Sequence, residues 1–132
     1  MRGWATLLLV ALALILAACQ QPTVEETVEE RAQTRWDHLV ERDFEPAWEL
    51  YSPGFRQTTD RVEYAQDMRA RPIRWHAAEV VGADCDGDQC KVTVSVTYQA
   101  VGASGPHRQM RMSRDLEEQW IRINERWWYV RN

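Results

Sequence analysis

Three cysteine thiols are the side chains of this 132-residue sequence best suited to covalent chemistry, and they stand at Cys19, Cys85 and Cys90. A thiolate is a strong nucleophile, so acylation and oxidation are its two obvious fates. An odd number of cysteines leaves one thiol over after any intramolecular pairing. The surroundings of each residue therefore decide which two pair and what the third does.

Cys19 closes a segment that has the composition of a secretory signal. Arg2 provides a positive start, an apolar run extends over residues 7–18, and small residues precede the thiol. A membrane-spanning helix would need about 20 apolar residues, whereas polar Gln20 and Gln21 follow this run at once. We therefore interpret the segment as a cleaved signal and not as a membrane span.

The stretch Leu16-Ala17-Ala18-Cys19 resembles the lipobox of bacterial lipoproteins, in which the thiol of the first mature residue is lipidated. This resemblance implies a signal peptide over 1–18, lipidation of Cys19 and a short tether over 19–23, with several acyl chains giving stable anchoring. Gln20 is not the aspartate that marks inner-membrane retention in enteric bacteria, so we expect the periplasmic side of an outer membrane. The alternative is an ordinary secretory signal with a coincidental cysteine.

Cys85 and Cys90 flank the turn-forming stretch Asp86-Gly87-Asp88-Gln89. Two cysteines at strand ends across a short hairpin loop come within disulfide range. An extracytoplasmic compartment is oxidising and favours the bond. We therefore predict a Cys85–Cys90 disulfide that holds the register of a hairpin.

Metal binding is the competing interpretation of the same region. Zinc is disfavoured because the two cysteines lack the close pair spacing of zinc sites. The histidines are scattered at His38, His76 and His107. The spacing of Asp84, Asp86 and Asp88 matches the first ligands of a calcium loop. However, Gln89 stands where that loop needs glycine, and Ser95 stands where it needs a bidentate glutamate. We expect no metal site and no cofactor.

Acid–base catalysis would need a carboxylate in an apolar pocket and donors for a developing oxyanion. The candidate bases are Asp37, Asp60 and Asp67, and the candidate donors are Tyr51, Tyr64 and His76. Asp60 is more simply a helix N-cap, and no two of these residues have a spacing that demands catalysis. The sequence therefore predicts no catalytic residue and favours a non-enzymatic module.

Three helices are expected before any strand. A capping box of Thr23 and Glu26 begins a helix over about 23–42, whose apolar residues recur at three- and four-residue steps. Pro46 suits the first turn of a short helix ending near Tyr51. A third helix is expected over about 61–69, with Val62, Tyr64, Ala65 and Met68 on its inward side.

Strands follow over about 73–81, 91–101, 108–123 and 127–130, with a tight turn at Asn124-Glu125 and a bulge near Asp115. The second strand alternates valine with polar residues, which is the period of a half-buried strand. This order predicts one α+β domain with helices on one face of an antiparallel sheet of about four strands. The net charge of −4 argues against a nucleic-acid partner.

The chain over 24–132 resembles the NTF2-like superfamily, which includes ketosteroid isomerases and SnoaL-type cyclases and has a cone-shaped α+β fold. Besides the long first helix and the short third helix, the resembling parts are Asp43-Phe44-x-x-Ala47-x-x-Leu50-Tyr51-Ser52-Pro53 and the closing Trp120-x-x-x-x-x-x-Trp127-Trp128-Tyr129-Val130. The resemblance implies a curved sheet that encloses a pocket with the helices, and a short strand between the helices at residues 56–58. It also implies a homodimer that pairs through the sheet face.

The expected pocket-lining residues are Trp36, Val40, Tyr51, Tyr64, Met68, Trp75, Val94, Val96 and Trp120. The alternative for each is ordinary core packing, because aromatic side chains bury large areas. We expect a membrane-anchored module that binds a small apolar ligand in the pocket or a protein partner on the sheet. The alternative function is an isomerase-, cyclase- or hydrolase-like enzyme acting on a small hydrophobic substrate.

Overall fold

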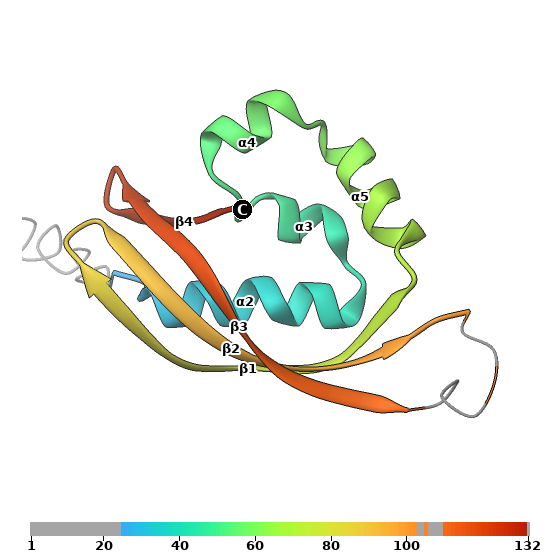
Figure 1. The fold of residues 1–132 in the computed structure, drawn as a ribbon. Coiled ribbons are helices and arrows are strands. Elements are labelled where there is room, and N and C mark those ends of the chain that lie inside the picture. The colour runs from blue at the N-terminus through green and yellow to red at the C-terminus, as the bar shows by residue number, and fades with distance from the viewer. Residues whose placement is uncertain (1–24, 103–104, 106–109, 132) are drawn as a thin grey trace, which may run out of the picture.

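The computed structural model describes residues 25–102, 105 and 110–131 (Figure 1). The expected signal peptide over 1–18, the lipidation site Cys19 and the tether over 19–23 lie outside the described residues. The helices are α2 (Val28–Glu41), α3 (Phe44–Trp48), α4 (Pro53–Thr58) and α5 (Arg61–Ala70). The strands are β1 (Ile73–Asp86), β2 (Gln89–Ala100), β3 (Arg111–Ile123) and β4 (Arg126–Val130).

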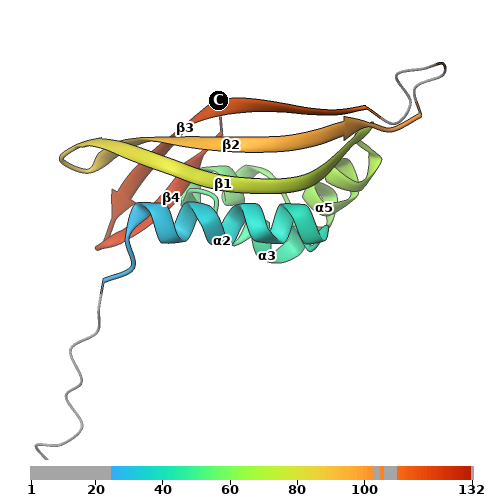
Figure 2. The ribbon, with the colours of Figure 1, turned by 90° about the horizontal axis from the view of Figure 1, so that it is seen from below.

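The strands form one antiparallel sheet in the order β1-β2-β3-β4. Figure 2 shows the described helices on one face of this sheet, with α2 running beside β1. The expected α+β class and the antiparallel four-stranded sheet are therefore confirmed. The sheet is open, and a closed cone around a central pocket is not what the strand order shows.

Helix α2 begins at a capping box of Thr27 and Glu30, four residues further along the chain than the expected box of Thr23 and Glu26. Thr27 Oγ1 accepts a hydrogen bond from the Glu30 amide at 3.2 Å, and the Glu30 carboxylate accepts one from the Thr27 amide at 2.9 Å. The four residues Thr-Val-Glu-Glu occur twice in succession, at 23–26 and 27–30. Both copies carry the signal, so the sequence pattern alone does not choose between them.

The segment between the long helix and α5 differs most from the sequence expectation. The short strand expected over 56–58 is wrong, because those residues belong to α4. Pro53 occupies the first turn of α4, where its fixed φ suits a helix and its missing N–H costs nothing. The N-cap expected at the start of α5 is confirmed, since Asp60 Oδ1 accepts from the amides of Val62 and Glu63. Val62 itself is 53% exposed and does not face inward as expected.

The register of β1 departs from simple alternation at two bulges, between Trp75 and Ala77 and between Val80 and Gly82. A bulge swaps the face that the following residues present. The residues of β1 that pack against the core are consequently Trp75, Ala78, Val80 and Ala83. The bulge expected near Asp115 in β3 is wrong, because β2 and β3 pair in unbroken register from Gln89↔Ile121 to Gln99↔Arg111.

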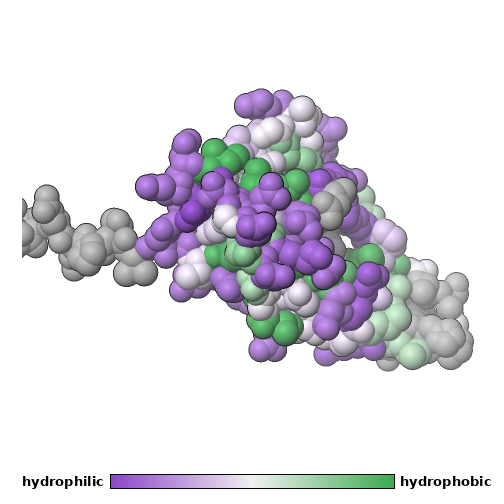
Figure 3. All heavy atoms as spheres, turned by 60° about the vertical axis from the view of Figure 1, so that its left-hand side comes forward, coloured by the Kyte–Doolittle hydropathy of each residue, from purple (hydrophilic) through white to green (hydrophobic). Residues whose placement is uncertain are grey.

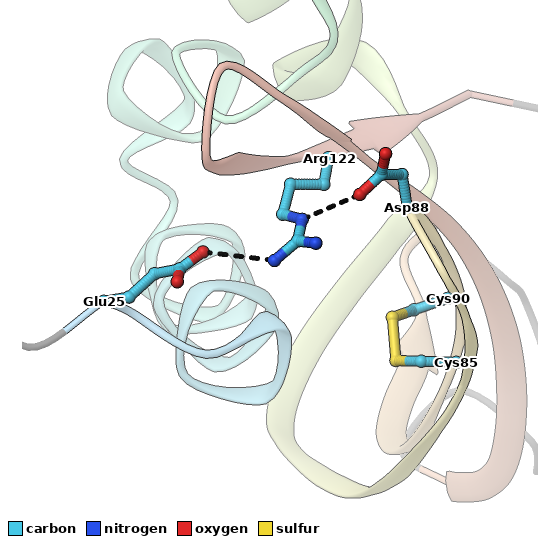
Figure 4. Close-up of a disulfide and its surroundings, with 5 residues drawn as sticks. All are labelled: Glu25, Cys85, Asp88, Cys90 and Arg122. Atoms are coloured by element: carbon cyan, nitrogen blue, oxygen red, sulfur yellow. Dashed lines mark hydrogen bonds and ion pairs between the residues drawn. A yellow bond between two sulfur atoms is a disulfide. The ribbon is translucent and has the colours of Figure 1, made fainter.

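The β1–β2 turn, the β3–β4 turn and the first described residues meet at one end of the sheet (Figure 4). Cys85 and Cys90 lie directly opposite each other and form the expected disulfide, with Cα atoms 4.0 Å apart. Arg122 bridges the hairpin tip and the start of the described chain, with Nε 2.9 Å from Asp88 Oδ1 and Nη1 3.5 Å from Glu25 Oε1. This bridge holds the beginning of the described chain next to the disulfide-bonded hairpin.

Candidate functional site

A cavity of about 560 Å³ lies between the helices and the sheet. Its apolar and aromatic wall comes from α2, α5 and the first three strands. These residues are Trp36, Leu39, Met68, Ile73, Trp75, Val96, Tyr98 and Leu116. The volume is within the range of small-molecule sites, about 300–1,000 Å³. The cavity is therefore large enough to hold a ligand of modest size.

A buried ion pair between helix and sheet lies at the floor of this cavity. Arg35 Nη1 of α2 is 2.8 Å from Glu118 Oε1 of β3, and the two residues are 4% and 5% exposed. A buried charge is costly unless it is paired and hydrogen-bonded. Both members line the cavity, so the pair sets its inner polarity.

Glu118 accepts two further hydrogen bonds from indole groups. Trp36 Nε1 donates to Oε1 at 3.0 Å, and Trp120 Nε1 donates to Oε2 at 3.1 Å. With Arg35 included, three donors from α2 and β3 engage this carboxylate. Glu118 is thus held in one position as a structural acceptor.

Arg35 is enclosed by aromatic rings as well as by the carboxylate. Its Nη2 donates to the Tyr51 hydroxyl at 3.2 Å, and its guanidinium lies 3.7 Å from the centre of the Tyr129 ring. Burial by itself would lower the pKa of Arg35. The charge of Glu118 and the neighbouring tyrosines outweigh burial, so this pKa lies above its ordinary value. Arg35 is therefore a permanent cation at the cavity floor.

Three tyrosines surround this pair. A backbone bridge places Tyr51 next to Tyr129 of β4, and the Tyr64 hydroxyl lies 3.3 Å from the Tyr51 hydroxyl. Burial raises the pKa of Tyr64, and Tyr51 adds to this effect while Arg35 opposes it. Burial also raises the pKa of Tyr129 against the opposing charge of Arg35. The hydroxyls of Tyr64 and Tyr129 therefore stay protonated and neutral at physiological pH.

The outer part of the cavity carries more arginines. Arg71, Arg114 and Arg131 line it while remaining partly or fully exposed, which places them at the rim. Arg71 makes an ion pair with Asp67 at 3.1 Å, and Arg131 lies over the Phe55 ring at 5.6 Å. Arg114 has no ion-pair partner among the described residues. The cavity thus combines an apolar wall, a neutralised floor and a cationic rim.

Comparison with known proteins gives matches only among solved structures: no protein-family model matches the chain, and no curated protein does. One match is the solution structure of a SEC-C motif containing protein from Rhodopseudomonas palustris. It has 17% identity and a TM-score of 0.62, and the match covers 90% of this chain and 84% of that one. Another is the crystal structure of a SEC-C motif containing protein from Psychrobacter arcticus, with 15% identity and a TM-score of 0.62.

The match to the Psychrobacter protein covers 85% of this chain and 63% of that one, so this chain spans less than two thirds of it. At these identities the likeness shows the fold alone.

The resemblance to the NTF2-like superfamily inferred from the sequence is wrong, because the matching structures are SEC-C motif containing proteins. These matches also supply no support for the resemblance to bacterial lipoproteins. Helices followed by a meander with a core rich in aromatics are compatible with more than one α+β fold, so the order of elements did not separate them.

The structure distributes the expected pocket residues between the cavity and the core. Five of them line the cavity, namely Trp36, Tyr51, Met68, Trp75 and Val96. Tyr64, Val94 and Trp120 are buried in the core cluster and do not line the cavity. Val40 is half-buried and lies in neither group. Seven of the nine, including four of those that line the cavity, belong to the buried core cluster, so core packing, the alternative interpretation, describes most of them.

The three aspartates considered as bases do not line this cavity. Asp37 is exposed and accepts a hydrogen bond from Gln33, Asp60 caps α5, and Asp67 pairs with Arg71. His76 lies on β1, where its Nε2 is 3.0 Å from Gln99 Oε1. The structure does not bring these groups together into an acid–base site.

Arg35 and Glu118, the two charged residues that are buried in the described part of the chain, were not expected at the site from the sequence. A signal for each was present. Arg35 falls on the same face as Ala32 and Leu39, because the residues are three and four positions apart. Glu118 lies two positions from Leu116 and two from Trp120 on β3, so the three side chains share one face of the strand. A charge at an inward position of each of two elements predicts a buried pair if those elements pack together.

Proposed function

We propose that this chain is a binding module that holds a small molecule in the cavity between the helices and the sheet. It is attached to the extracytoplasmic side of a bacterial membrane through acylation of Cys19. The observation that carries the binding proposal is the 560 Å³ cavity with its wall of aromatic and aliphatic side chains. Such a wall can bury most of a small ligand and recover the free energy of removing apolar surface from water.

Binding without chemical conversion is favoured by the state of the cavity carboxylate. Glu118 is engaged by three donors, including the guanidinium of Arg35. A general base needs a lone pair that can reach a substrate proton. The aspartates considered as bases lie away from the cavity, so the enzymatic alternative has lost its candidate bases.

The extracytoplasmic location is supported by the lipobox-like stretch Leu16-Ala17-Ala18-Cys19 and by the Cys85–Cys90 disulfide, since such bonds persist mainly in oxidising compartments. Figure 3 shows one face of the described domain, where hydrophilic residues predominate and hydrophobic ones form small separate patches. No described helix is long and apolar enough to cross a membrane. Attachment in this proposal therefore depends on the acyl chains.

The binding proposal can be tested with the neutral fluorophore N-phenyl-1-naphthylamine, using the soluble Cys19→Ser variant secreted to a periplasm. We expect a saturable rise in fluorescence. Leu116→Trp places bulk in the cavity and should abolish the rise, whereas Asp115→Trp, the next residue on the opposite face of β3, should not. No saturable rise, or an equal rise in both tryptophan variants, would overturn the binding proposal.

The attachment proposal has a separate test. The wild-type protein should sediment with membranes, and Cys19→Ser should be released into the soluble fraction. Continued sedimentation of Cys19→Ser with membranes would contradict acylation as the anchor without affecting the cavity.

A further inference from the structure

The charges around the cavity do not balance. Glu118 is neutralised by Arg35 at 2.8 Å. Glu117 also touches the cavity, but its carboxylate pairs with Lys91 at 3.7 Å. Successive residues of a strand point to opposite faces, so the Glu117 side chain lies across the sheet from Glu118. The acidic side chains of the lining are therefore already matched.

The arginines at the rim are matched only in part. Asp67 pairs with Arg71, while Arg131 has an aromatic neighbour in Phe55 and Arg114 has no ionic partner among the described residues. These cations come from three places in the chain, after α5, on β3 and after β4. The fold thus gathers an excess of positive charge on one opening.

The apolar wall begins directly beside these cations. Arg114 is paired in register with Val96, and both line the cavity together with Leu116 and Trp75. A ligand that is apolar along its body and anionic at its end matches this arrangement.

We infer that the cavity takes an amphipathic anion, with its aliphatic or aromatic body against the wall and its carboxylate or phosphate at the arginine rim. This inference rests on the proposed binding function and specifies its ligand class. Guanidinium groups bind carboxylate and phosphate through pairs of parallel hydrogen bonds. Because the floor pair is already neutral, the charge of the ligand is matched at the rim.

The test compares three probes that share one alkyl chain: laurate, dodecanol and dodecylammonium. Each displaces bound N-phenyl-1-naphthylamine from the soluble Cys19→Ser protein. We expect laurate to bind at least about tenfold more tightly than dodecanol, a difference of about 1.4 kcal/mol, and dodecylammonium to bind most weakly. Arg114→Glu should remove most of the preference for laurate and leave dodecanol binding nearly unchanged.

Arg111→Glu is the matched control, because Arg111 is exposed on the same strand and lies on the opposite face from Arg114. It makes the same change in net charge and should keep the preference for laurate. Equal affinities for the three probes, or equal effects of the two variants, would overturn the anion inference. The proposed binding function would survive that result, because it fails on a different outcome: no saturable N-phenyl-1-naphthylamine fluorescence, or an equal rise in the two tryptophan variants.

An anionic group of this kind belongs either to a soluble amphipath or to a membrane lipid. Vesicles of phosphatidylglycerol, compared with vesicles of phosphatidylcholine, separate these sources. Selective co-sedimentation of the Cys19→Ser protein with phosphatidylglycerol, lost in Arg114→Glu and kept in Arg111→Glu, identifies a lipid as the ligand. Laurate binding without vesicle retention identifies a soluble amphipathic anion, and both results support the ligand class.

Discussion

Arg35 and Glu118 are 83 positions apart in the chain, yet their side chains meet at 2.8 Å in the interior. Their side chains are 5% and 6% exposed, and the pair joins α2 to β3. Two indole donors and one tyrosine hydroxyl complete the arrangement. The core of this domain is therefore organised around one polar contact as well as around apolar packing.

Removing one member of this pair should destabilise the domain strongly. Glu118→Ala leaves the Arg35 charge buried without a partner, and we expect a loss of about 3–5 kcal/mol in the free energy of unfolding. The double variant Arg35→Met/Glu118→Ala removes both charges and should cost less than the sum of the single changes Arg35→Met and Glu118→Ala. Urea denaturation of the four proteins measures this, and strictly additive effects would show that the contact has no energetic role.

The tyrosines around Arg35 should make the domain sensitive to alkaline pH. Burial raises the pKa of Tyr64 in the folded state, while an unfolded tyrosine titrates near about 10. The unfolded state therefore loses its proton first, so the stabilisation is complete below about pH 10 and is lost as pH rises above that value. Tyr64→Phe cannot lose this proton.

We expect Tyr64→Phe to be less stable than the wild type near neutral pH by about 1 kcal/mol, because one hydrogen bond is lost. The deficit should shrink by about pH 11, as the wild type loses stability faster. Adding Tyr129→Phe should flatten the alkaline slope further, since burial also raises the pKa of Tyr129. Urea unfolding across this pH range measures the slopes, and parallel slopes in all three proteins would contradict the prediction.

Local features of this fold could be predicted from the sequence because neighbouring residues determine them. Asn124 and Glu125 both have positive φ, of 50° and 62°, as a two-residue hairpin loop requires, and asparagine favours that region. The alternating valines of β2 are buried as expected. The disulfide across the first hairpin follows from two cysteines at the ends of a short turn.

Features that depend on distant partners could not be predicted in the same way. The bulges in β1 depend on how that strand fits β2 and α2, where the Gln33 side chain bonds to the Ala78 carbonyl and the Val80 amide. Whether an inward aromatic such as Trp120 faces a cavity or closed core depends on what packs over it. The charged floor of the cavity and the residues of its wall therefore required the coordinates.

The start of α2 gives a prediction that separates two identical sequence signals. Thr27→Ala removes the side-chain cap of the helix and should cost about 1 kcal/mol of stability. Thr27→Ser keeps the hydroxyl and should cost little. Thr23→Ala, in the first copy of the repeated Thr-Val-Glu-Glu sequence, is the matched control and should leave the unfolding midpoint unchanged. A larger loss in Thr23→Ala than in Thr27→Ala would place the helix start at the first copy.

The disulfide should stabilise the domain moderately, because it closes a loop between cysteines only five positions apart. Loop closure of this length restricts the unfolded chain by about 2 kcal/mol, although the hairpin already holds Cys85 opposite Cys90. We expect dithiothreitol to lower the free energy of unfolding by up to this amount, because reduction removes that restriction from the unfolded chain. The Cys85→Ala/Cys90→Ala variant should start from the lower stability and show no response to the reductant. Mass spectrometry must first show that reduction is complete. If the wild-type unfolding curve is then identical with and without reductant, the disulfide does not contribute to the free energy of unfolding. In that case the register of the hairpin would be held by the β1–β2 pairing and the Gly87 turn alone.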